Sequence, residues 1–292
     1  LKAGDEVVTT THDYPRMIHT WRQRQARDGI VLKMVSYPAP PQSMGDLVRR
    51  IEQAITPRTK VILVCHMTFT TGQIFPVKEI CRLGRERNIE VIIDGAHSFG
   101  HFPFKQADLD CDYYGTSLHK WTMAPGGTGF TFIRRSKIAN IWPLQPADAK
   151  LKDDIRKFEQ VGTHSPAQHN AIIEALNFME ALGVERKAAR FRYLRERWTT
   201  RLARLPRIQI LTSSDPAQSC CLGTLSVKDA DTAFHSKLAD TLESKYGILV
   251  AAIGRGTTDY LEFHGIRVTP NFFTSVREVD AFSDAVEKEL KA

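Results

Sequence analysis

Two segments decide how this chain folds: VIIDGAHSFG at residues 91–100 and DCDYYGTSLHKWTMAPGGTG at residues 110–129. In the first segment, a short apolar run ends at Asp94. In the second, a run that ends near Gly115 is followed by Lys120 and a cluster of glycines. Ligands of open α/β sheets bind just outside the carboxyl ends of parallel strands. We therefore expect the acid and the lysine to share one site.

A lysine and a carboxylate in one site can serve a cofactor. A lysine amine can attack a carbonyl group and form a Schiff base. A carboxylate beside a pyridinium nitrogen keeps that nitrogen protonated, because an opposite charge favours the charged form. These two groups are what pyridoxal phosphate (PLP) requires of a protein. The pattern predicts that Lys120 binds PLP as a Schiff base and that Asp94 faces the ring nitrogen.

The same segments resemble a known family. The pattern D-G-A-H-S-x-G, followed by G-T-S-x-H-K, is similar to the class V aminotransferases, a branch of the fold-type I PLP enzymes. This branch includes cysteine desulfurases and isopenicillin N epimerase-like proteins. The resemblance extends along the chain through GDEVVTTTHDYP, HMTFTTGQIFPVKEI, VGTHSP and GIRVTPNFFTSVREVDAF. The HDYP and DGAH motifs are most similar to the isopenicillin N epimerase-like proteins.

The distribution of apolar and polar residues along the chain predicts strands that alternate with helices. We expect strands at residues 6–10, 30–35, 60–65 and 90–93, and helices at 17–28, 45–55 and 77–88. Such alternation indicates βαβ units and a parallel sheet. After residue 165 we expect a long helix to about residue 205, broken near Gly183. Further strands are expected at 208–211, 223–227, 248–253 and 260–268, and helices at 233–246 and 276–291.

The resemblance implies an α/β fold, that of a fold-type I PLP-dependent transferase. Residues 1–165 would form a large PLP-binding domain with a mostly parallel sheet. Residues 166–292 would form a connecting helix and a small α+β C-terminal domain. Family members carry a substantial segment before GDEVV, so we expect the N-terminal part of the large domain, and any targeting signal in it, to be missing.

Composition narrows the class of protein. The chain has 292 residues, of which 42% are hydrophobic and 25% charged, as in ordinary globular proteins. No run approaches the ~18 apolar residues of a membrane span, and no secretory signal begins the chain. The net charge of +7 is spread along helices, so we expect solvated helix faces rather than nucleic-acid binding. Five cysteines without a C-x-x-C pair predict no zinc site and reduced cytoplasmic thiols.

The resemblance assigns roles to further residues around the cofactor. His97 would contact the ring or its phenolic oxygen. Ser117 and His119 would hold the phosphate, since hydroxyl and imidazole groups donate hydrogen bonds to phosphate oxygens. Tyr14 would stack on the ring, with His12 and Asp13 as weaker candidates. Each of these residues could instead serve a local turn, and Gly126–Gly129 is expected to form a tight turn.

The resemblance also assigns two residues to roles outside the cofactor pocket of their own chain. Thr163 resembles the position from which a partner subunit reaches the phosphate, which implies a homodimer with a shared active site; its alternative role is the N-cap of a helix. Arg267 resembles the arginine that binds the substrate carboxylate, and its planar guanidinium suits bidentate binding. Alternation around Arg267 places it on one distinct strand face, which could also face water.

The sequence departs from the family pattern at two places. Phe69 stands where many members have asparagine, so we expect His97 to compensate for a lost polar contact. Desulfurases carry a nucleophilic cysteine in a mobile loop, and the corresponding residues 247–260 contain none. Cys220 and Cys221 lie about thirty residues earlier, so a persulfide mechanism is disfavoured.

These observations predict a PLP-dependent enzyme that acts on an amino-acid substrate, with an aminotransferase, epimerase or lyase outcome left open. Lys120 would move the α-proton as general acid and base. The alternative from another class is a non-catalytic fold-type I scaffold kept for binding. No metal, membrane or nucleic-acid partner is expected.

Overall fold

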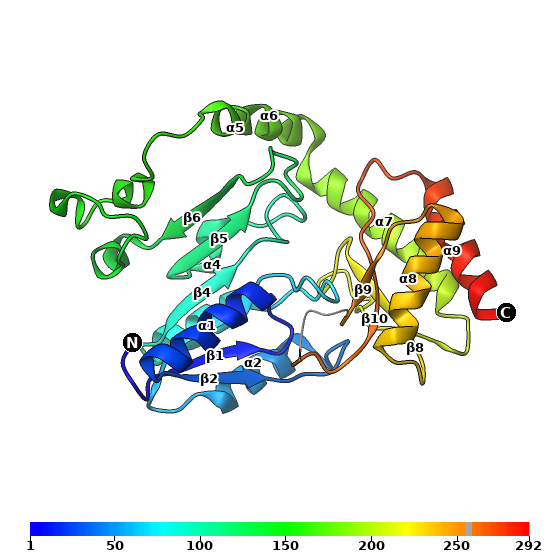
Figure 1. The fold of residues 1–292 in the computed structure, drawn as a ribbon, viewed down its shortest axis with the longest axis horizontal. Helices are drawn as coiled ribbons and strands as arrows, with labels where there is room; N and C mark the ends of the chain where they lie inside the picture. The colour runs from blue at the N-terminus through cyan, green and yellow to red at the C-terminus, as the bar shows by residue number, and fades with distance from the viewer. Residues whose placement is uncertain (255–258, 292) are drawn as a thin grey trace.

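The chain folds around two β-sheets, and the computed structural model describes residues 1–254 and 259–291. Figure 1 places the larger sheet towards the N-terminus and the smaller one towards the C-terminus. The larger sheet has the strand order β2-β1-β3-β4-β5-β6. Its strands are β1 (Glu6–Thr10), β2 (Val31–Val35), β3 (Thr59–Cys65), β4 (Glu90–Asp94), β5 (Tyr113–Ser117) and β6 (Gly129–Ile133). The first five run parallel and β6 is antiparallel, so the predicted mostly parallel sheet is confirmed.

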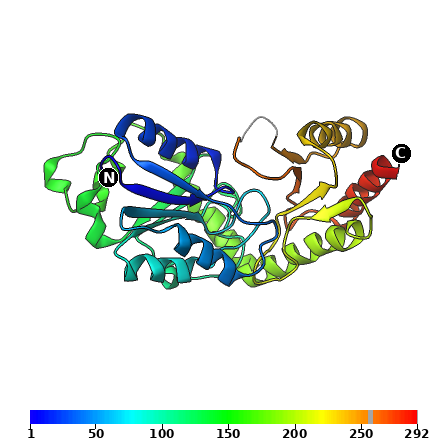
Figure 2. The ribbon, with the colours of Figure 1, turned by 90° about the horizontal axis from the view of Figure 1, so that it is seen from below.

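Helices cover both faces of this sheet (Figure 2). They are α1 (Pro15–Asp28) on one face and α2 (Met44–Ala54) and α3 (Val77–Glu86) on the other. Successive strand residues point to opposite faces, so a doubly covered strand must be apolar at nearly every position. Val8 and Ile62 accordingly join the core beneath α2 and α3, while Val7 and Val61 join the smaller core beneath α1.

The edge strand β6 is absent from the sequence-based prediction, which recognised only the turn before it. Gly129 already pairs with Ser117 across the hairpin. A Cβ at Gly129 would lie 2.4 Å from the carbonyl oxygen of Thr116, so only glycine allows the two strands this approach. The glycines therefore serve both the predicted turn and the first strand position after it.

A long segment, residues 134–166, connects β6 of the larger sheet to the helices that follow. It contains three 3-10 helices, namely η1 (Arg135–Asn140), η2 (Ala149–Leu151) and η3 (Ile155–Glu159). Three α-helices follow as α5 (Ala167–Asn170), α6 (Ile172–Leu182) and α7 (Val184–Leu202), with the predicted break at Gly183. Pro166 occupies the N-cap of α5, so the alternative role of Thr163 as an N-cap is wrong. One further short helix, α4 (Gln106–Leu109), precedes β5.

The smaller sheet is antiparallel, with the order β7-β8-β10-β9. Its strands are β7 (Ile208–Ile210), β8 (Gly223–Val227), β9 (Ala251–Ile253) and β10 (Gly265–Val268). The helices α7, α8 (Thr232–Tyr246) and α9 (Val276–Lys291) pack against it and bury Trp198, Leu242 and Phe282. The strand predicted at 260–268 is wrong in its first half, because regular pairing begins only at residue 265. The domain boundary near residue 165 stays a prediction.

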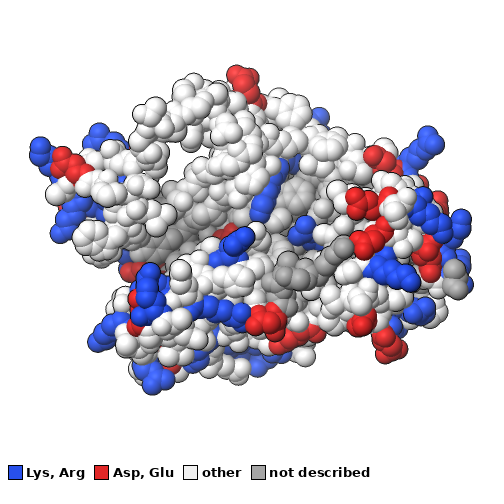
Figure 3. Space-filling model, in the orientation of Figure 1, with Lys and Arg blue, Asp and Glu red and all other residues white. Residues whose placement is uncertain are grey.

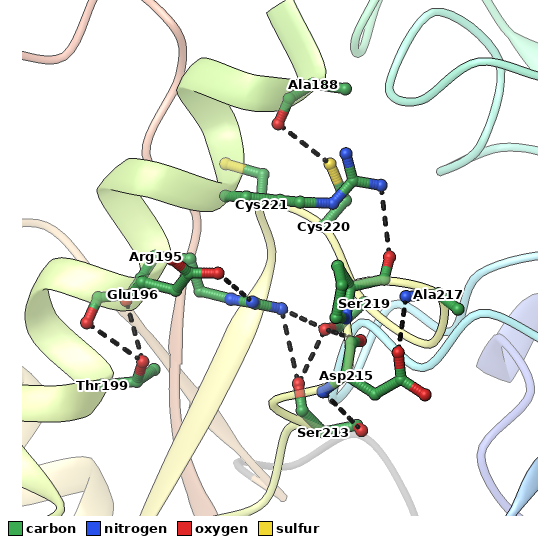
Figure 4. Close-up of polar contacts among 12 residues, drawn as sticks. Ala188, Arg195, Glu196, Thr199, Ser213, Asp215, Ala217, Ser219, Cys220 and Cys221 are labelled. Atoms are coloured by element: carbon green, nitrogen blue, oxygen red, sulfur yellow. Dashed lines mark hydrogen bonds and ion pairs between the residues drawn. The ribbon is translucent and has the colours of Figure 1, made fainter. Parts of the chain in front are cut away.

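Helix α7 corrects the expectation of a fully solvated basic face. Lys187 and Arg195 are each only 1% exposed. Figure 4 shows the Arg195 guanidinium pointing from α7 towards Ser213 and Ser219, and it donates to the carbonyl oxygen of the first and the hydroxyl of the second. Part of the positive charge of the chain is therefore used inside the fold.

Candidate active site

The carboxyl ends of β1, β3, β4 and β5 open into one cavity of about 680 Å³. Parallel sheets bind ligands at this edge, and the volume is typical of small-molecule sites. Figure 3 shows this side of the molecule hollowed near its centre, with Lys and Arg side chains beside the hollow. Six of the eight predicted site residues line the cavity, namely Tyr14, Asp94, His97, Ser117, His119 and Lys120. The fold thus gathers residues that lie more than a hundred positions apart in the sequence.

Asp94 is the last residue of β4 and pairs in register with Cys65 on one side and Gly115 on the other. Its Oδ1 accepts a hydrogen bond of 2.9 Å from the backbone N–H of Ala96. Burial raises the pKa of Asp94, while the backbone hydrogen bond and the charge of Lys120 oppose this shift. A carboxylate that is costly to bury, and whose other oxygen has no hydrogen-bond partner among the described residues, is suited to bind a cation in the cavity.

Lys120 lies in the turn that follows β5, half-buried in the wall of the cavity. Burial lowers the pKa of its amine, and the negative charge of Asp94 opposes that effect. The Nζ atom lies 5.9 Å from the centre of the Tyr14 ring and 3.2 Å from His97 Nε2. A lysine amine with a lowered pKa is a better nucleophile, because more of it is neutral.

His97 lies between the lysine and a buried tryptophan. Its Nδ1 accepts a hydrogen bond of 3.2 Å from the indole N–H of Trp121. Burial lowers the pKa of His97 well below its usual value, and the charges of Lys120 and Arg267 lower it further. The imidazole is therefore neutral under ordinary conditions.

Small and polar residues line the part of the cavity beside the β5–β6 hairpin. The Nδ1–H of His119 donates to the carbonyl oxygen of Thr128 at 3.2 Å, which leaves Nε2 for a ligand. Ser117 lines the same wall. A Cβ placed on Gly115 would meet no atom within 4 Å, so this strand position opens onto free space. Arg16, at the start of α1, adds a cation that sequence reasoning missed, although it directly follows the HDYP motif.

A second cavity of about 410 Å³ adjoins the first and shares Tyr14, Phe69, His97 and Lys120 with it. Arg267 of β10 lines this second cavity. One guanidinium N–H donates to the carbonyl oxygen of Phe69 at 3.1 Å, and Nε is buried without a partner among the described residues. Phe69 therefore contributes to this contact through its backbone carbonyl group.

Thr163 is the predicted site residue that this chain does not bring to the others. It lies in a run of exposed residues from 161 to 170 and lines neither of the two adjoining cavities. Its predicted role depends on a second subunit and stays a prediction.

The residues of the cavity fit PLP. Asp94 supplies a half-buried acid with one oxygen that accepts no hydrogen bond from the described residues, and Lys120 supplies an amine with a lowered pKa. Gly115 leaves room for a flat ring between them, and Phe69 and Tyr14 form an aromatic wall with ring centres 5.4 Å apart. Hydroxyl and imidazole groups at the hairpin end suit a phosphate.

A second buried acid was only a weak candidate in the sequence. Asp13 is fully buried and accepts hydrogen bonds from the Thr9 and Thr10 hydroxyls and the Cys65 thiol. Its pKa is raised to about 6, mainly by burial and to a lesser extent by the nearby charge of Asp94, while these hydrogen bonds oppose the rise. Asp13 does not line the cavity, and its neighbour His12 is buried beside Tyr37 at a ring distance of 3.9 Å. Asp13 and His12 are therefore buried at the end of β1 and do not line the cavity.

Cysteine chemistry finds little support in the described part of the chain. Cys220 and Cys221 are fully buried, and burial raises the pKa of Cys220 to about 11 and that of Cys221 well above its usual value. Figure 4 shows the Cys220 thiol directed at the backbone of Ala188 on α7. Residues 255–258, within the stretch that corresponds to the cysteine-bearing loop of desulfurases, lie outside the described residues.

Two other kinds of site were also sought in residues 1–254 and 259–291. No cluster of three or more His, Cys, Asp or Glu side chains is arranged to hold a metal ion there. No helix in that part combines the length and the apolar character that a membrane span requires.

Comparison with known proteins gives consistent matches. The family described as aminotransferase class-V matches residues 1–282. An isopenicillin N epimerase from Streptomyces clavuligerus is 26% identical over 98% of this chain and 74% of its own length. A probable cysteine desulfurase from Mycolicibacterium paratuberculosis is 29% identical over 99% of this chain and 42% of its own length.

The solved structures are similar in fold. The apo cysteine desulfurase from Thermococcus onnurineus NA1 superposes with a TM-score of 0.84 at 19% identity, covering 100% of this chain and 74% of that one. This likeness, together with the mostly parallel and the small antiparallel sheet, confirms the predicted fold-type I architecture.

Proposed function

Since the chain belongs to the aminotransferase class-V family and is a PLP-dependent enzyme of that type, we propose that it transfers the α-proton of an amino-acid substrate through Lys120. One observation carries the proposal: Asp94 ends β4, Lys120 follows the adjacent strand β5, and both line the same cavity. Family membership in an enzyme class disfavours the non-catalytic scaffold.

Different residues of the first cavity would bind different parts of the cofactor. Lys120 would hold its aldehyde end covalently, and Asp94 would accept a hydrogen bond from the protonated ring nitrogen. Ser117 and His119 would bind the phosphate, and Tyr14 would cover the ring. When bound, PLP withdraws electrons from the α-carbon of the substrate.

Side chains of the protein would then transfer the α-proton of the substrate. The amine of Lys120, freed when substrate takes its place, accepts the proton from the α-carbon and can return it as an ammonium. The adjoining cavity would hold the substrate side chain and carboxylate, with Arg267 as the carboxylate ligand. Tyr14 and Phe69 line both cavities, so their rings would exclude water from the reacting carbon.

Replacing Arg267 by methionine is expected to raise KM for the amino acid by roughly 100-fold, because a charge-assisted bidentate contact is worth about 2–3 kcal/mol. Arg267→Lys keeps the charge but loses the planar fork, so KM should rise less. Steady-state kinetics with the preferred amino acid measures both. Arg190→Met is the control, since Arg190 donates to the carbonyl oxygens of Phe272 and Thr274 and lines neither cavity. An unchanged KM in Arg267→Met would remove this assignment.

The reaction outcome is decided by incubating PLP-loaded protein with L- and D-amino acids in D₂O. Deuterium at the α-carbon reports proton transfer, a change of enantiomer reports epimerisation, and an oxo acid reports transamination. We expect deuterium exchange, and we expect no persulfide on the protein after incubation with cysteine, because the described cysteines are buried with raised pKa values. Absence of exchange with every amino acid would refute the proposal.

We also propose that two copies of the chain complete each site. Apolar side chains between residues 142 and 178 are exposed, with Trp142 92% and Leu144 102% exposed, and Val161, Ile173 and Phe178 more than half exposed. Exposed apolar surface of this extent marks an interface, and a second copy would cover it. Thr163 lies in the same segment, from which it would reach the phosphate of the partner subunit. The five free cysteines accord with the proposed cytoplasmic location.

Mixing two impaired variants tests the shared site. Lys120→Ala homodimers lack the reactive amine, and Thr163→Ala homodimers should bind PLP roughly 10-fold more weakly, since one hydrogen bond to a charged group is lost. Mixed dimers contain one intact site, so activity at limiting PLP should exceed that of either variant alone. Sedimentation measures the oligomeric state. A monomer, or no gain on mixing, would contradict the shared site.

A further inference from the structure

We propose that Trp121 is a positioning residue: its indole N–H selects the Nε2–H tautomer of His97, which in turn keeps Lys120 as a neutral amine before the cofactor binds. The inference rests on the proposed function of Lys120 and extends it. It concerns a residue that lines the second cavity but not the first.

The first step is the tautomer of His97. Indole is a donor only, so the contact of 3.2 Å from Trp121 Nε1 requires a lone pair on His97 Nδ1. A neutral imidazole carries one N–H, which must then be on Nε2. The doubly protonated form would set two N–H groups against each other, and burial lowers the pKa of His97 well below its usual value.

The second step is the protonation state of Lys120. His97 Nε2 lies 3.2 Å from Lys120 Nζ, so the N–H on Nε2 is directed at the amine. An ammonium has three donors and no acceptor, whereas a neutral amine has a lone pair for this hydrogen bond. Only the neutral form of Lys120 therefore satisfies both contacts of the imidazole at once.

Other charged and polar groups that face Lys120 divide between the two states. Asp94 and Cys65, at neighbouring strand ends, favour the ammonium, while burial and Arg267 of β10 favour the neutral amine. The ring of Tyr14, 5.9 Å from Nζ, favours the cation. Because these influences oppose one another, one oriented hydrogen bond can decide the balance.

The surrounding contacts hold Trp121 in place for this role. Its ring stacks on His101 with centroids 3.8 Å apart, and its carbonyl oxygen accepts from the buried Lys187. The backbone N–H of Cys221 donates to His101 Nε2 at 3.0 Å, so His101 Nδ1–H donates to the carbonyl oxygen of His97 at 2.8 Å. The ring and the backbone of His97 are thus both fixed from the side of α7 and the smaller sheet.

The test measures the reactivity of Lys120 in the full chain freed of cofactor. Trace acetic anhydride acetylates only neutral amines, and mass spectrometry of the Lys120 peptide from pH 6 to pH 10 gives the midpoint. In Trp121→Phe the midpoint is expected to rise by about one pH unit, which lowers the reactivity near neutral pH by roughly tenfold. Nitrogen-15 NMR of labelled histidine should show the Nε2–H tautomer of His97 in the parent and a loss of this preference in the variant.

Trp198→Phe is the matched control, because Trp198 is also buried but its Nε1 has no partner among the described residues. It should leave the Lys120 midpoint unchanged. If Trp121→Phe does not fold, a benzothienyl side chain at position 121, in which sulfur replaces the N–H, removes the donor without changing the shape. An unchanged midpoint and tautomer in either replacement would overturn the inference.

This experiment separates the inference from the proposed function. Acetylation reads Lys120 without any cofactor, so a failure of Lys120 to bind PLP would refute the proposed function and leave the measured midpoints intact. Conversely, a Lys120 that binds PLP but keeps its midpoint in Trp121→Phe would refute only the role of Trp121.

Discussion

Replacing Lys120 by alanine is expected to abolish the yellow colour that PLP gives the purified protein and to lower turnover by ~10³-fold or more, since a covalent anchor and a general base are lost together. The side chain lies in the wall of the cavity with a pKa lowered by burial, and Asp94 lies in the same wall. Absorption spectra after dialysis, with single-turnover kinetics at saturating PLP, measure both effects.

A second buried lysine provides the control for Lys120→Ala. Lys187 donates to the carbonyl oxygen of Trp121 and lies 3.2 Å from the sulfur of Met179, and burial lowers its pKa to about 8. Lys187 lines neither cavity, so Lys187→Met should keep the colour after dialysis even if its stability falls. Colour and activity that survive in Lys120→Ala would end the proposed function.

Asp94→Asn is expected to preserve folding and lower the rate of α-proton exchange by roughly 10²–10⁴-fold, or about 3–5 kcal/mol in the barrier. An amide has nearly the same shape and can still accept the hydrogen bond from Ala96, but it carries no charge to keep a ring nitrogen protonated. Deuterium exchange at the α-carbon, measured at saturating PLP and substrate, gives the rate of the step that depends on this charge.

Asp13→Asn distinguishes charge at the cofactor from charge in the general region. Asp13 is buried, interacts electrostatically with Asp94 and lies outside the cavity. Its replacement should alter stability, because four donors lose a carboxylate partner, while the exchange rate changes only a few-fold. Equal rate losses in the two variants would show that Asp94 has no specific role at the ring.

Much of the larger sheet could be predicted because each of its parallel strands has a recognisable local pattern of apolar residues. Doubly covered strands such as β3 are apolar at nearly every position, and the helices between them show apolar residues at helical spacing. The antiparallel edge strand β6 was missed, because its partly exposed residues follow a glycine cluster that by itself predicts only a tight turn. The second strand of the hairpin is defined by pairing across the turn, which periodicity does not report.

The candidate site divides in the same way. Asp94, Ser117 and Lys120 could be chosen from the sequence because they follow strand-like runs, and motif resemblance added His97 and Arg267. The roles of Trp121, Lys187 and His101 could not be predicted, since each depends on contacts between segments far apart in the chain. Burial of a lysine within the basic helix α7 is likewise invisible to a pattern that is polar overall.

The sequence by itself determined the class of fold and the pair of groups around which we propose that a PLP site is built, because strand periodicity and the residues at each strand end are local properties. Only the tertiary structure decided which atoms face which. A proton on one imidazole nitrogen or the other depends on the partner within about 3 Å, and that partner is brought there by packing between α7, the larger sheet and the smaller sheet.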